Sequence, residues 1–424
     1  MSSTARWFGV AAAGLLLALP VRAEILFMST QLRPIEEAQK MREVILKDFP
    51  EEVTFVPEDG GPFINRIQAE GQTGQVTVGV LGGLHGDFPP VLAYLAPLDA
   101  ALAKLSADRQ FIPSFVDLGK LGTDQQMYIP WMQATYIMAA NREALAYLPE
   151  GADLNRLTYD QLLAWARAIT EATGERKLGF PAGPKGLMHR FLQGYLYPSF
   201  TGGVVRTFKS DDARAMWAQF RELWQYVNPR STAYDFMQEP LLAGEVWIAF
   251  DHTARLMNAL NSEPDRFVAF AAPAGPKGRG FMPVVAGLAV PKGTPDPEAS
   301  LRLIDYLTRP EVQVTTLRAV GFYPVVAAEL AEDLPAGVRL AAAAIDAQAG
   351  APDALPSLLP VGLGAKGGAF NKVYRDTFER IVIRGQDIEE ALEIQARRLA
   401  QIMEDTGAPC WAPDAPSDGP CPVE

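Results

Sequence analysis

The chain has 424 residues, of which 48% are hydrophobic, 21% charged and 9% aromatic, and its formal net charge is −12. This composition excludes a disordered polar chain, a collagen and a small disulfide-stapled domain, and the length suffices for two domains with separate cores. The acidic balance repels phosphate backbones and anionic lipids, so we expect no nucleic acid among the partners.

The first 23 residues have the pattern of a cleaved export signal. Arg6 precedes an apolar run over residues 7–19, Pro20 follows, and Val21-Arg22-Ala23 is a suitable cleavage tripeptide. The alternative is a membrane anchor, but the run is shorter than the ~20 residues of a spanning helix. No Cys follows the cut before Glu24, so we expect a periplasmic protein without a lipid anchor. Cleavage removes two arginines and no acid, which changes the net charge from −12 to −14.

The mature chain alternates short apolar strands with amphipathic helices. Strands are expected at residues 24–29, 53–56 and 76–81, and a helix at residues 35–49 has one apolar face. Thr158 and Gln161 form a capping box that opens a helix ending at Gly174. Further helices are expected at residues 211–227, 297–307, 310–319, 370–383 and 388–403. This alternation predicts an α/β fold with parallel strands joined by right-handed crossovers.

Two extended apolar runs interrupted by proline, at residues 127–141 and 267–276, are candidates for segments that pass between lobes. Ordinary strands followed by loops are the alternative. The predicted boundaries are 24–130 and 271–310 for lobe 1, and 131–270 and 311–403 for lobe 2. A Pro-rich tail follows at 404–424, in which we expect Cys410 and Cys421 to form a disulfide without a catalytic role.

Motifs for common enzyme chemistry are absent. The sequence contains no HExxH, GxSxG or GxxxxGK[ST], and His85, His189 and His252 are too far apart for a sequence-local metal site. Residues 362–367 match part of a dinucleotide-binding turn, but two prolines stand where its first strand is needed. We therefore expect no cofactor, no metal and no catalytic residue.

Aromatic and polar residues gather at the ends of the expected strands. An aromatic face covers the apolar side of a pyranose and polar groups bond to its hydroxyls, so this mixture is typical of sugar sites. The members are Trp131, Gln133, Tyr136, Tyr195, Tyr197, Trp247, Asp251, His252 and Arg255. Core packing of Tyr195 and Tyr197, and a helix-surface ion pair between Asp251 and Arg255, are the alternatives.

Several motifs occur in an order that resembles a known family. Pro297 to Gln313, followed by Gly321-Phe322-Tyr323-Pro324, resembles a late helical signature, and residues 157–162 are similar to Pro-x-Thr-Trp-x-Glu-Leu. Over residues 24–403 the chain resembles the family 1 extracellular solute-binding proteins, which are periplasmic receptors of sugar-importing ABC transporters and include maltose-binding protein. A tryptophan common in that family is replaced at residues 251–254, which puts a maltodextrin-like specificity in doubt.

The resemblance implies a two-lobe periplasmic binding protein fold of type II, the Venus-flytrap form, in which mixed sheets flanked by helices are hinged by crossing segments. It also implies a monomeric receptor that captures a sugar, oligosaccharide or polyol by closing and delivers it to the permease subunits of an ABC transporter in the inner membrane. The implied ligand-binding residues are Thr30, Gln31, His85, Asp87, Trp131, Gln133, Tyr195, Tyr197, Asp251, His252, Arg255, Phe281, Met282 and Asn371. The alternatives are a secreted carbohydrate-active enzyme and a receptor for another solute, such as a polyamine or ferric ion.

Overall fold

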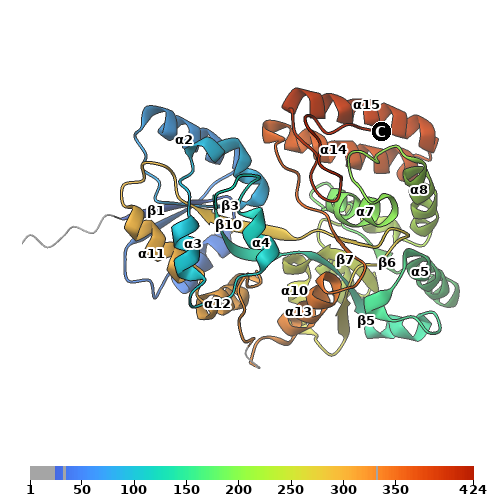
Figure 1. Cartoon of the computed structure of the whole chain (residues 1–424). Helices are drawn as coiled ribbons and strands as arrows, with labels where there is room; N and C mark the ends of the chain where they lie inside the picture. Colours follow the sequence, from blue (N-terminus) through green and yellow to red (C-terminus); the bar gives the residue numbers. More distant parts are fainter. Residues whose placement is uncertain (1–23, 32–34, 331–332) are drawn as a thin grey trace, which may run out of the picture.

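The computed structural model describes residues 24–31, 35–330 and 333–424. The predicted export signal, residues 1–23, lies outside the described residues. The chain forms two lobes connected by crossing segments (Figure 1). None of the described helices combines the length and the apolar character that a membrane span requires.

Lobe 1 is built on a mixed five-stranded sheet. Its strands, in spatial order, are β2 (Val53–Pro57), β1 (Ile25–Ser29), β3 (Val80–Leu84), β10 (Val284–Ala289) and β4 (Ile129–Ala134). Strand β1 is parallel to β2 and β3, as predicted, whereas β10 runs antiparallel to β3 and β4. Strand β3 begins four residues later than predicted, because Val76 to Gly79 lead into the sheet rather than pair along it.

Helices cover both faces of this sheet because successive strand residues point to opposite sides. Phe27 packs in the same core cluster as Met41 and Ile45, whereas its neighbour Met28 packs with Phe63 and Ile67 on the other face. The helical elements of the lobe are α1 (Ile35–Lys40), a π-helical turn (Met41–Ile45), α2 (Gly60–Thr73), α3 (Asp99–Leu105), α4 (Pro113–Leu118), α11 (Pro297–Leu307) and α12 (Pro310–Val320).

Lobe 2 contains a four-stranded sheet in the order β6 (Leu178–Gly179), β7 (Ile248–His252), β5 (Tyr136–Asn141) and β8 (Phe267–Phe270). The predicted capping box is present before α5, because Thr158 Oγ1 accepts from Gln161 N at 3.2 Å and Gln161 Oε1 accepts from Thr158 N at 3.0 Å. The helices are α5 (Tyr159–Thr173), α6 (Met188–Phe191), α7 (Tyr197–Thr201), α8 (Asp211–Trp224), α9 (Gln238–Leu242), α10 (Thr253–Ser262), α13 (Ala336–Ala349), α14 (Gly367–Phe378) and α15 (Ile388–Thr406).

Three segments connect the lobes, and their positions differ from the predicted lobe boundaries. Strand β4 stays in the lobe 1 sheet and continues through Thr135 into β5 of lobe 2. Strand β9 (Arg279–Phe281) pairs with β11 (Ala354–Pro356) and packs on α7, so residues 271–281 lie with lobe 2 and not lobe 1. Helix α12 packs on α1 and the π-helical turn, so residues 311–320 lie with lobe 1. The predicted boundaries followed prolines, whereas strand pairing and helix packing determine the lobes.

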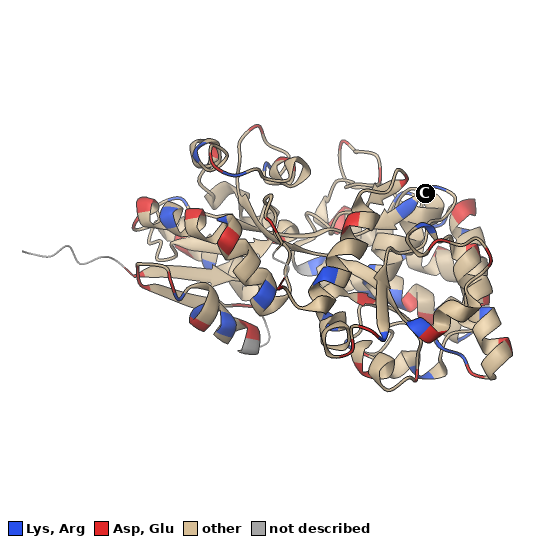
Figure 2. Cartoon of the chain, turned by 90° about the horizontal axis from the view of Figure 1, so that it is seen from below, with Lys and Arg blue, Asp and Glu red and all other residues tan. Residues whose placement is uncertain are grey.

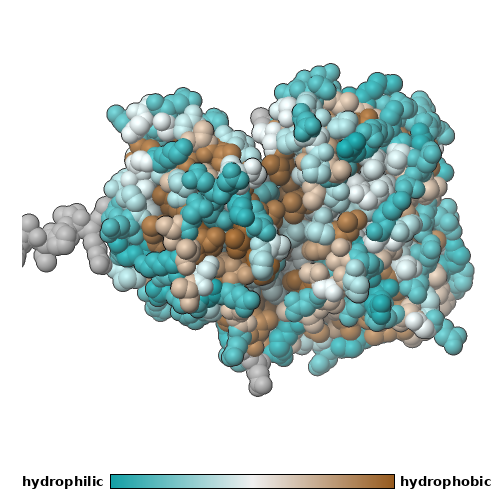
Figure 3. Space-filling model, in the orientation of Figure 1, coloured by the Kyte–Doolittle hydropathy of each residue, from teal (hydrophilic) through white to brown (hydrophobic). Residues whose placement is uncertain are grey.

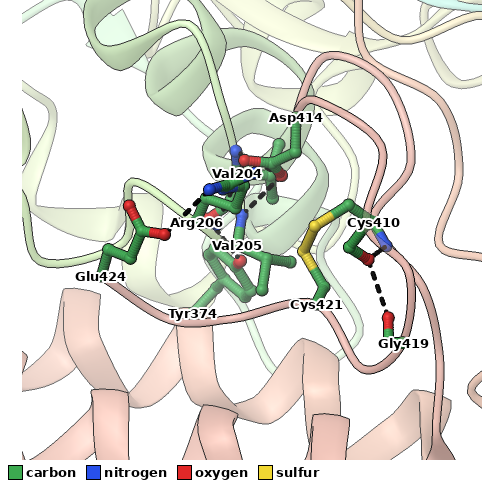
Figure 4. The surroundings of a disulfide bond; sticks show 10 residues. Val204, Val205, Arg206, Tyr374, Cys410, Asp414, Gly419, Cys421 and Glu424 are labelled. Carbon is green, nitrogen blue, oxygen red and sulfur yellow. Dashed lines mark hydrogen bonds and ion pairs between the residues drawn. A yellow bond between two sulfur atoms is a disulfide. The ribbon is translucent and has the colours of Figure 1, made fainter.

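The C-terminal tail is fastened to lobe 2. Cys410 and Cys421 form the predicted disulfide, and Leu358 N donates to Ala412 O at 3.0 Å. The buried carboxylate of Asp414 accepts the backbone N–H groups of residues 204, 205 and 206 at 2.9, 2.8 and 3.1 Å (Figure 4). Elsewhere, acidic and basic residues are interspersed along the ribbon of both lobes (Figure 2).

Candidate functional site

A cleft of about 710 Å³ lies between the lobes, bounded by α2 and the loop after β3 on one side and by α14 on the other. Figure 3 shows the molecule hollowed between these two helices. In open α/β sheets, ligands bind outside the carboxyl ends of the strands, and this cleft adjoins the ends of β2 and β3. The polar side chains that line it are Asn65, Gln68, Asp87, Arg190 and Asn371.

The lobe 1 side of the cleft contains Asp87 beside Thr30 and Gln31, three residues that were predicted to bind the ligand. Asp87 Oδ2 accepts a hydrogen bond from Thr30 Oγ1 at 2.7 Å and from Leu84 N at 2.9 Å. Gln31 Nε2 donates to the Thr30 hydroxyl at 3.2 Å. Burial raises the pKa of Asp87, while these hydrogen bonds and the charge of Arg190 act in the opposite direction. The structure therefore brings the loops after β1 and β3 together at the cleft.

The lobe 2 wall combines the predicted Asn371 with the unpredicted Arg190, and the buried side chain of Gln193 links the two behind the wall. Gln193 Nε2 donates to Asn371 Oδ1 at 3.0 Å, and Arg190 Nη1 lies 3.5 Å from Gln193 Oε1. Arg190 is half-buried at the cleft. Arg190 directly precedes residues 191–200, all of which are buried, and no local sequence pattern indicated that its side chain faces the cleft.

His85 lies in the cleft loop but turns into lobe 1. Its side chain is 8% exposed, and its Nδ1 lies 3.0 Å from the hydroxyl of Tyr128. Burial lowers the pKa of His85 to about 4, so the imidazole is neutral at physiological pH. His85 therefore supports the loop that carries Asp87.

Three other predicted ligand residues lie at the crossing segments. Tyr195 Oη accepts from Tyr136 N at 3.1 Å and donates to Tyr136 O at 2.8 Å, and Thr135 Oγ1 donates to Met282 O at 2.9 Å. Gln133 exchanges two backbone hydrogen bonds with Tyr323 in the third crossing segment. The structure places Gln133, Tyr195 and Met282 at the hinge and not on the cleft wall.

Trp131, Tyr197 and Asp251 are completely buried, at 0% exposure each, and do not line the cleft. Trp131 packs edge-on against Phe27, and Tyr197 Oη donates to Phe208 O at 3.0 Å. The large apolar area of an aromatic ring favours core packing, which outweighed the predicted stacking role. Asp251 accepts the N–H groups of residues 237 and 252 at 3.0 and 2.8 Å, and burial raises its pKa to about 7.

His252 and Arg255 also take structural positions. The ring of His252 packs edge-on against Tyr136, and burial lowers its pKa to about 3. Arg255 Nη1 donates to Asp235 O at 3.0 Å, and its guanidinium lies 4.4 Å from the centre of the Phe236 ring. The alternative ion pair with Asp251 is not formed among the described residues.

A second cavity of about 550 Å³ lies between α4 and α13. Two predicted residues, Gln133 and Phe281, line it together with mostly apolar side chains such as Ile112, Phe115 and Leu358. Ser114, Thr135, Asp346 and Gln348 also line this cavity, so it has as many polar side chains as the cleft beside α2, but a larger share of its exposed lining is apolar. The cleft beside α2 carries both a cation and a carboxylate and is the better candidate for a polar ligand.

The side chains that line the candidate cleft restrict its chemistry. Among the described residues they include no aromatic ring and a single carboxylate, that of Asp87. The described residues contain no group of three or more His, Cys, Asp or Glu placed to hold a metal ion. The glycine-rich residues 362–367 lead into α14 at the cleft, but the strand before them, β11, pairs only with β9 and not with a nucleotide-binding sheet.

Comparisons with solved structures identify the architecture. Maltose-bound MalE3 from Thermotoga maritima has a TM-score of 0.67 at 20% identity, over 89% of this chain and 98% of that chain. MalE from Xanthomonas citri has a TM-score of 0.69 at 17% identity, over 90% and 97%. UgpB from Mycobacterium tuberculosis, solved with glycerophosphocholine, has a TM-score of 0.69 at 18% identity, over 90% and 99%. The predicted two-lobe periplasmic binding protein fold is thereby confirmed.

A search of curated proteins returned no match. The family described as bacterial extracellular solute-binding protein matches residues 35–314, which is more than half of the chain. This match covers all strands of the two sheets except β1, includes the first two crossing segments and ends within α12, and it agrees with the shared fold. The chain therefore belongs to the family of bacterial extracellular solute-binding proteins.

Proposed function

We propose that the protein is a periplasmic receptor that captures a carbohydrate in the interlobe cleft and delivers it to an ABC importer. The observation that carries this proposal is the cleft itself, in which polar side chains of both lobes face one cavity. Maltose in the MalE3 structure and glycerophosphocholine in the UgpB structure are hydroxylated small molecules, which supports a ligand of this class. A sugar, an oligosaccharide or a polyol fits the hydrogen-bonding groups of the cleft.

Capture follows from contacts that a ligand makes with both lobes. A solute that bonds to Asp87 on lobe 1 and to Asn371 on lobe 2 stabilises the closed arrangement, because only that arrangement satisfies both contacts. The lobes also approach closely at Gly86, where an added Cβ would lie 2.7 Å from Pro360 O. The closed receptor then docks on the permease, and the ligand leaves chemically unchanged.

The cleft disfavours the alternatives that the sequence left open. A glycoside hydrolase requires two facing carboxylates, and Asp87 is the only one among the described residues that line the cleft. A polyamine receptor needs several acids, but Asp251 is buried in the core. A ferric site with Tyr195 and Tyr197 as ligands requires accessible phenols, and both rings are fully buried.

A thermal-shift screen of sugars and polyols tests the proposal. A ligand at 100 times its dissociation constant stabilises the folded protein by about 2.7 kcal/mol. We expect the shift to be lost in Asp87→Asn and Asn371→Ala, and to persist in Asp418→Asn, an exposed tail control. Chromatography of the released solute must show it intact. A hydrolysed product, or no stabilisation by any neutral or charged hydroxylated solute, contradicts the proposal.

Gly86→Ala tests the closing motion separately. The added methyl group would collide with the Pro360 carbonyl, which belongs to the opposite lobe and cannot give way as a flexible side chain can. We expect weaker ligand binding and an X-ray scattering profile of a more extended molecule. Gly368→Ala in α14 is the matched control, because a Cβ there meets no atom within 4 Å and Gly368 does not line the cleft.

A further inference from the structure

We propose that the solute carries an anionic group, a carboxylate or a phosphate, which Arg190 binds while Asp87 binds a hydroxyl of the same molecule. This inference rests on the proposed function and names the ligand class of the same cleft. Arg190 lines the cleft from lobe 2, within the short helix α6. Among the described residues, no carboxylate lies within ion-pair distance of its guanidinium, whose single hydrogen bond is the 3.5 Å contact with Gln193.

Several arginines of this acidic chain have carboxylate partners even on the surface, whereas others, such as Arg255, bond to backbone carbonyls. Arg302 holds Glu51 with two nitrogens at 2.6 and 2.9 Å, although half of its side chain is exposed. A guanidinium that is half-buried in a cleft loses part of its hydration, and an arriving anion restores that interaction through two parallel hydrogen bonds. The unpaired cation at the cleft is therefore suited to an anionic ligand.

Lobe 2 carries further cations near His189, the residue before Arg190, whereas the carboxylate that acts on Arg190 is that of Asp87 on lobe 1. The charges of Arg190, Arg375 and Arg255 all act on the buried imidazole of His189, and together with burial they lower its pKa. The first turn of α14, at Gly367, also borders the cleft from lobe 2 and directs the positive end of its helix dipole there. The lobe 2 wall is thus positive.

Asp87 faces this wall and defines the other end of the ligand. Its Oδ2 is occupied by Thr30 and Leu84, whereas its Oδ1 has no hydrogen-bond partner among the described residues. A carboxylate oxygen accepts a hydroxyl group but repels an anion. The ligand therefore places its hydroxyls toward lobe 1 and its anionic group toward lobe 2, as a sugar acid, a sugar phosphate or a polyol phosphate does. Contacts with both lobes favour closure.

Calorimetry with matched solutes at constant ionic strength tests this inference. The probes are glucuronate and glucose 6-phosphate against glucose, glycerol 3-phosphate against glycerol, and inorganic phosphate against chloride. We expect at least one anion to bind about tenfold or more tighter than its neutral counterpart, as charged hydrogen bonds allow. The two kinds of anion separate a carboxylate ligand from a phosphate ligand.

Two variants assign the effect to Arg190. Arg190→Gln is expected to lower the ratio of the anion's affinity to that of its neutral counterpart from about tenfold or more to about one, whatever the affinity for the neutral solute becomes. Arg176→Gln, the same change at an exposed site of lobe 2, is the control. If Arg190→Gln does not fold, Arg190→Lys must give an intermediate preference, because it keeps the charge and loses the paired hydrogen bonds.

The outcomes distinguish this inference from the proposed function. A neutral sugar that binds as tightly as its anionic counterpart, with equal affinity in wild type and Arg190→Gln, overturns the anionic ligand and leaves the receptor function intact. An anion that binds equally well to Arg190→Gln also overturns it. If neither neutral nor anionic solutes bind, both proposals fail.

Discussion

Replacing Asp414 by Asn is expected to loosen the C-terminal tail together with the wall of the cleft that it supports. The carboxylate of Asp414 is 6% exposed and accepts three backbone N–H groups (Figure 4). An Asn side chain keeps one acceptor oxygen, but its NH2 group, a hydrogen-bond donor, would face a backbone N–H that is also a donor. One buried N–H left unpaired costs about 1–3 kcal/mol, and the loss of charge from the remaining bonds brings the total to about 2–4 kcal/mol.

Hydrogen exchange measures this local loss of stability directly. A decrease of about 2–4 kcal/mol speeds exchange of the N–H groups of residues 204–206 by about 30- to 1000-fold. Because Leu358 N bonds to the tail at Ala412 O, residues 358–363, which border the cleft, should exchange faster too. Asp418→Asn makes the same change at an exposed tail position and should have no effect. Unchanged exchange at residues 204–206 in Asp414→Asn would refute the reasoning.

Three further outcomes are expected. Replacing both Cys410 and Cys421 by Ser should lower the free energy of unfolding by about 3 kcal/mol, since the disulfide closes a short loop in the unfolded chain; urea denaturation with and without reductant measures this. Burial raises the pKa of Asp251 from 3.8 to about 7, so the folded state holds a proton that the unfolded state has released. The contribution of this proton to the free energy of unfolding is complete below pH 4 and is lost by pH 7, a decrease on the order of 4 kcal/mol. Urea denaturation at pH 5 and pH 8 should therefore show stability falling with pH. A flat profile in the wild type, or an undiminished slope in Asp251→Asn, contradicts the assignment. Tyr195→Phe leaves a buried N–H of Tyr136 without its partner, which should lower stability by about 1–3 kcal/mol and alter the interlobe scattering profile, whereas wild-type values in both measurements would show that the hydroxyl does not secure the hinge.

Local patterns were sufficient to predict much of the fold. The capping box at Thr158 and Gln161 forms the hydrogen bonds that its spacing predicts, and α11 spans the predicted residues 297–307. Cys410 and Cys421 are close in the chain and form the predicted disulfide. These features depend on residues within a few positions of one another, so the sequence contains their signals directly.

The lobe assignments and the cleft depended on long-range packing. Residues 311–320 follow a proline that suggested a boundary, yet α12 packs on α1 of lobe 1. Trp131 and Tyr197 were expected to stack on a sugar ring, but burial of their own rings in the cores was more favourable than exposure at a cleft. Arg190 was not predicted, because no local pattern shows which side of α6 faces the opposite lobe.

By itself, the sequence determined the alternation of strands and helices, the capping and disulfide sites, and a family resemblance that the comparisons confirmed. The tertiary structure alone decided which polar groups meet across the cleft, because Asp87 and Arg190 lie about a hundred residues apart and are brought to one cavity by the packing of two lobes. Periodicity and capping act over one or two turns of chain, whereas a binding site is formed by contacts between distant segments.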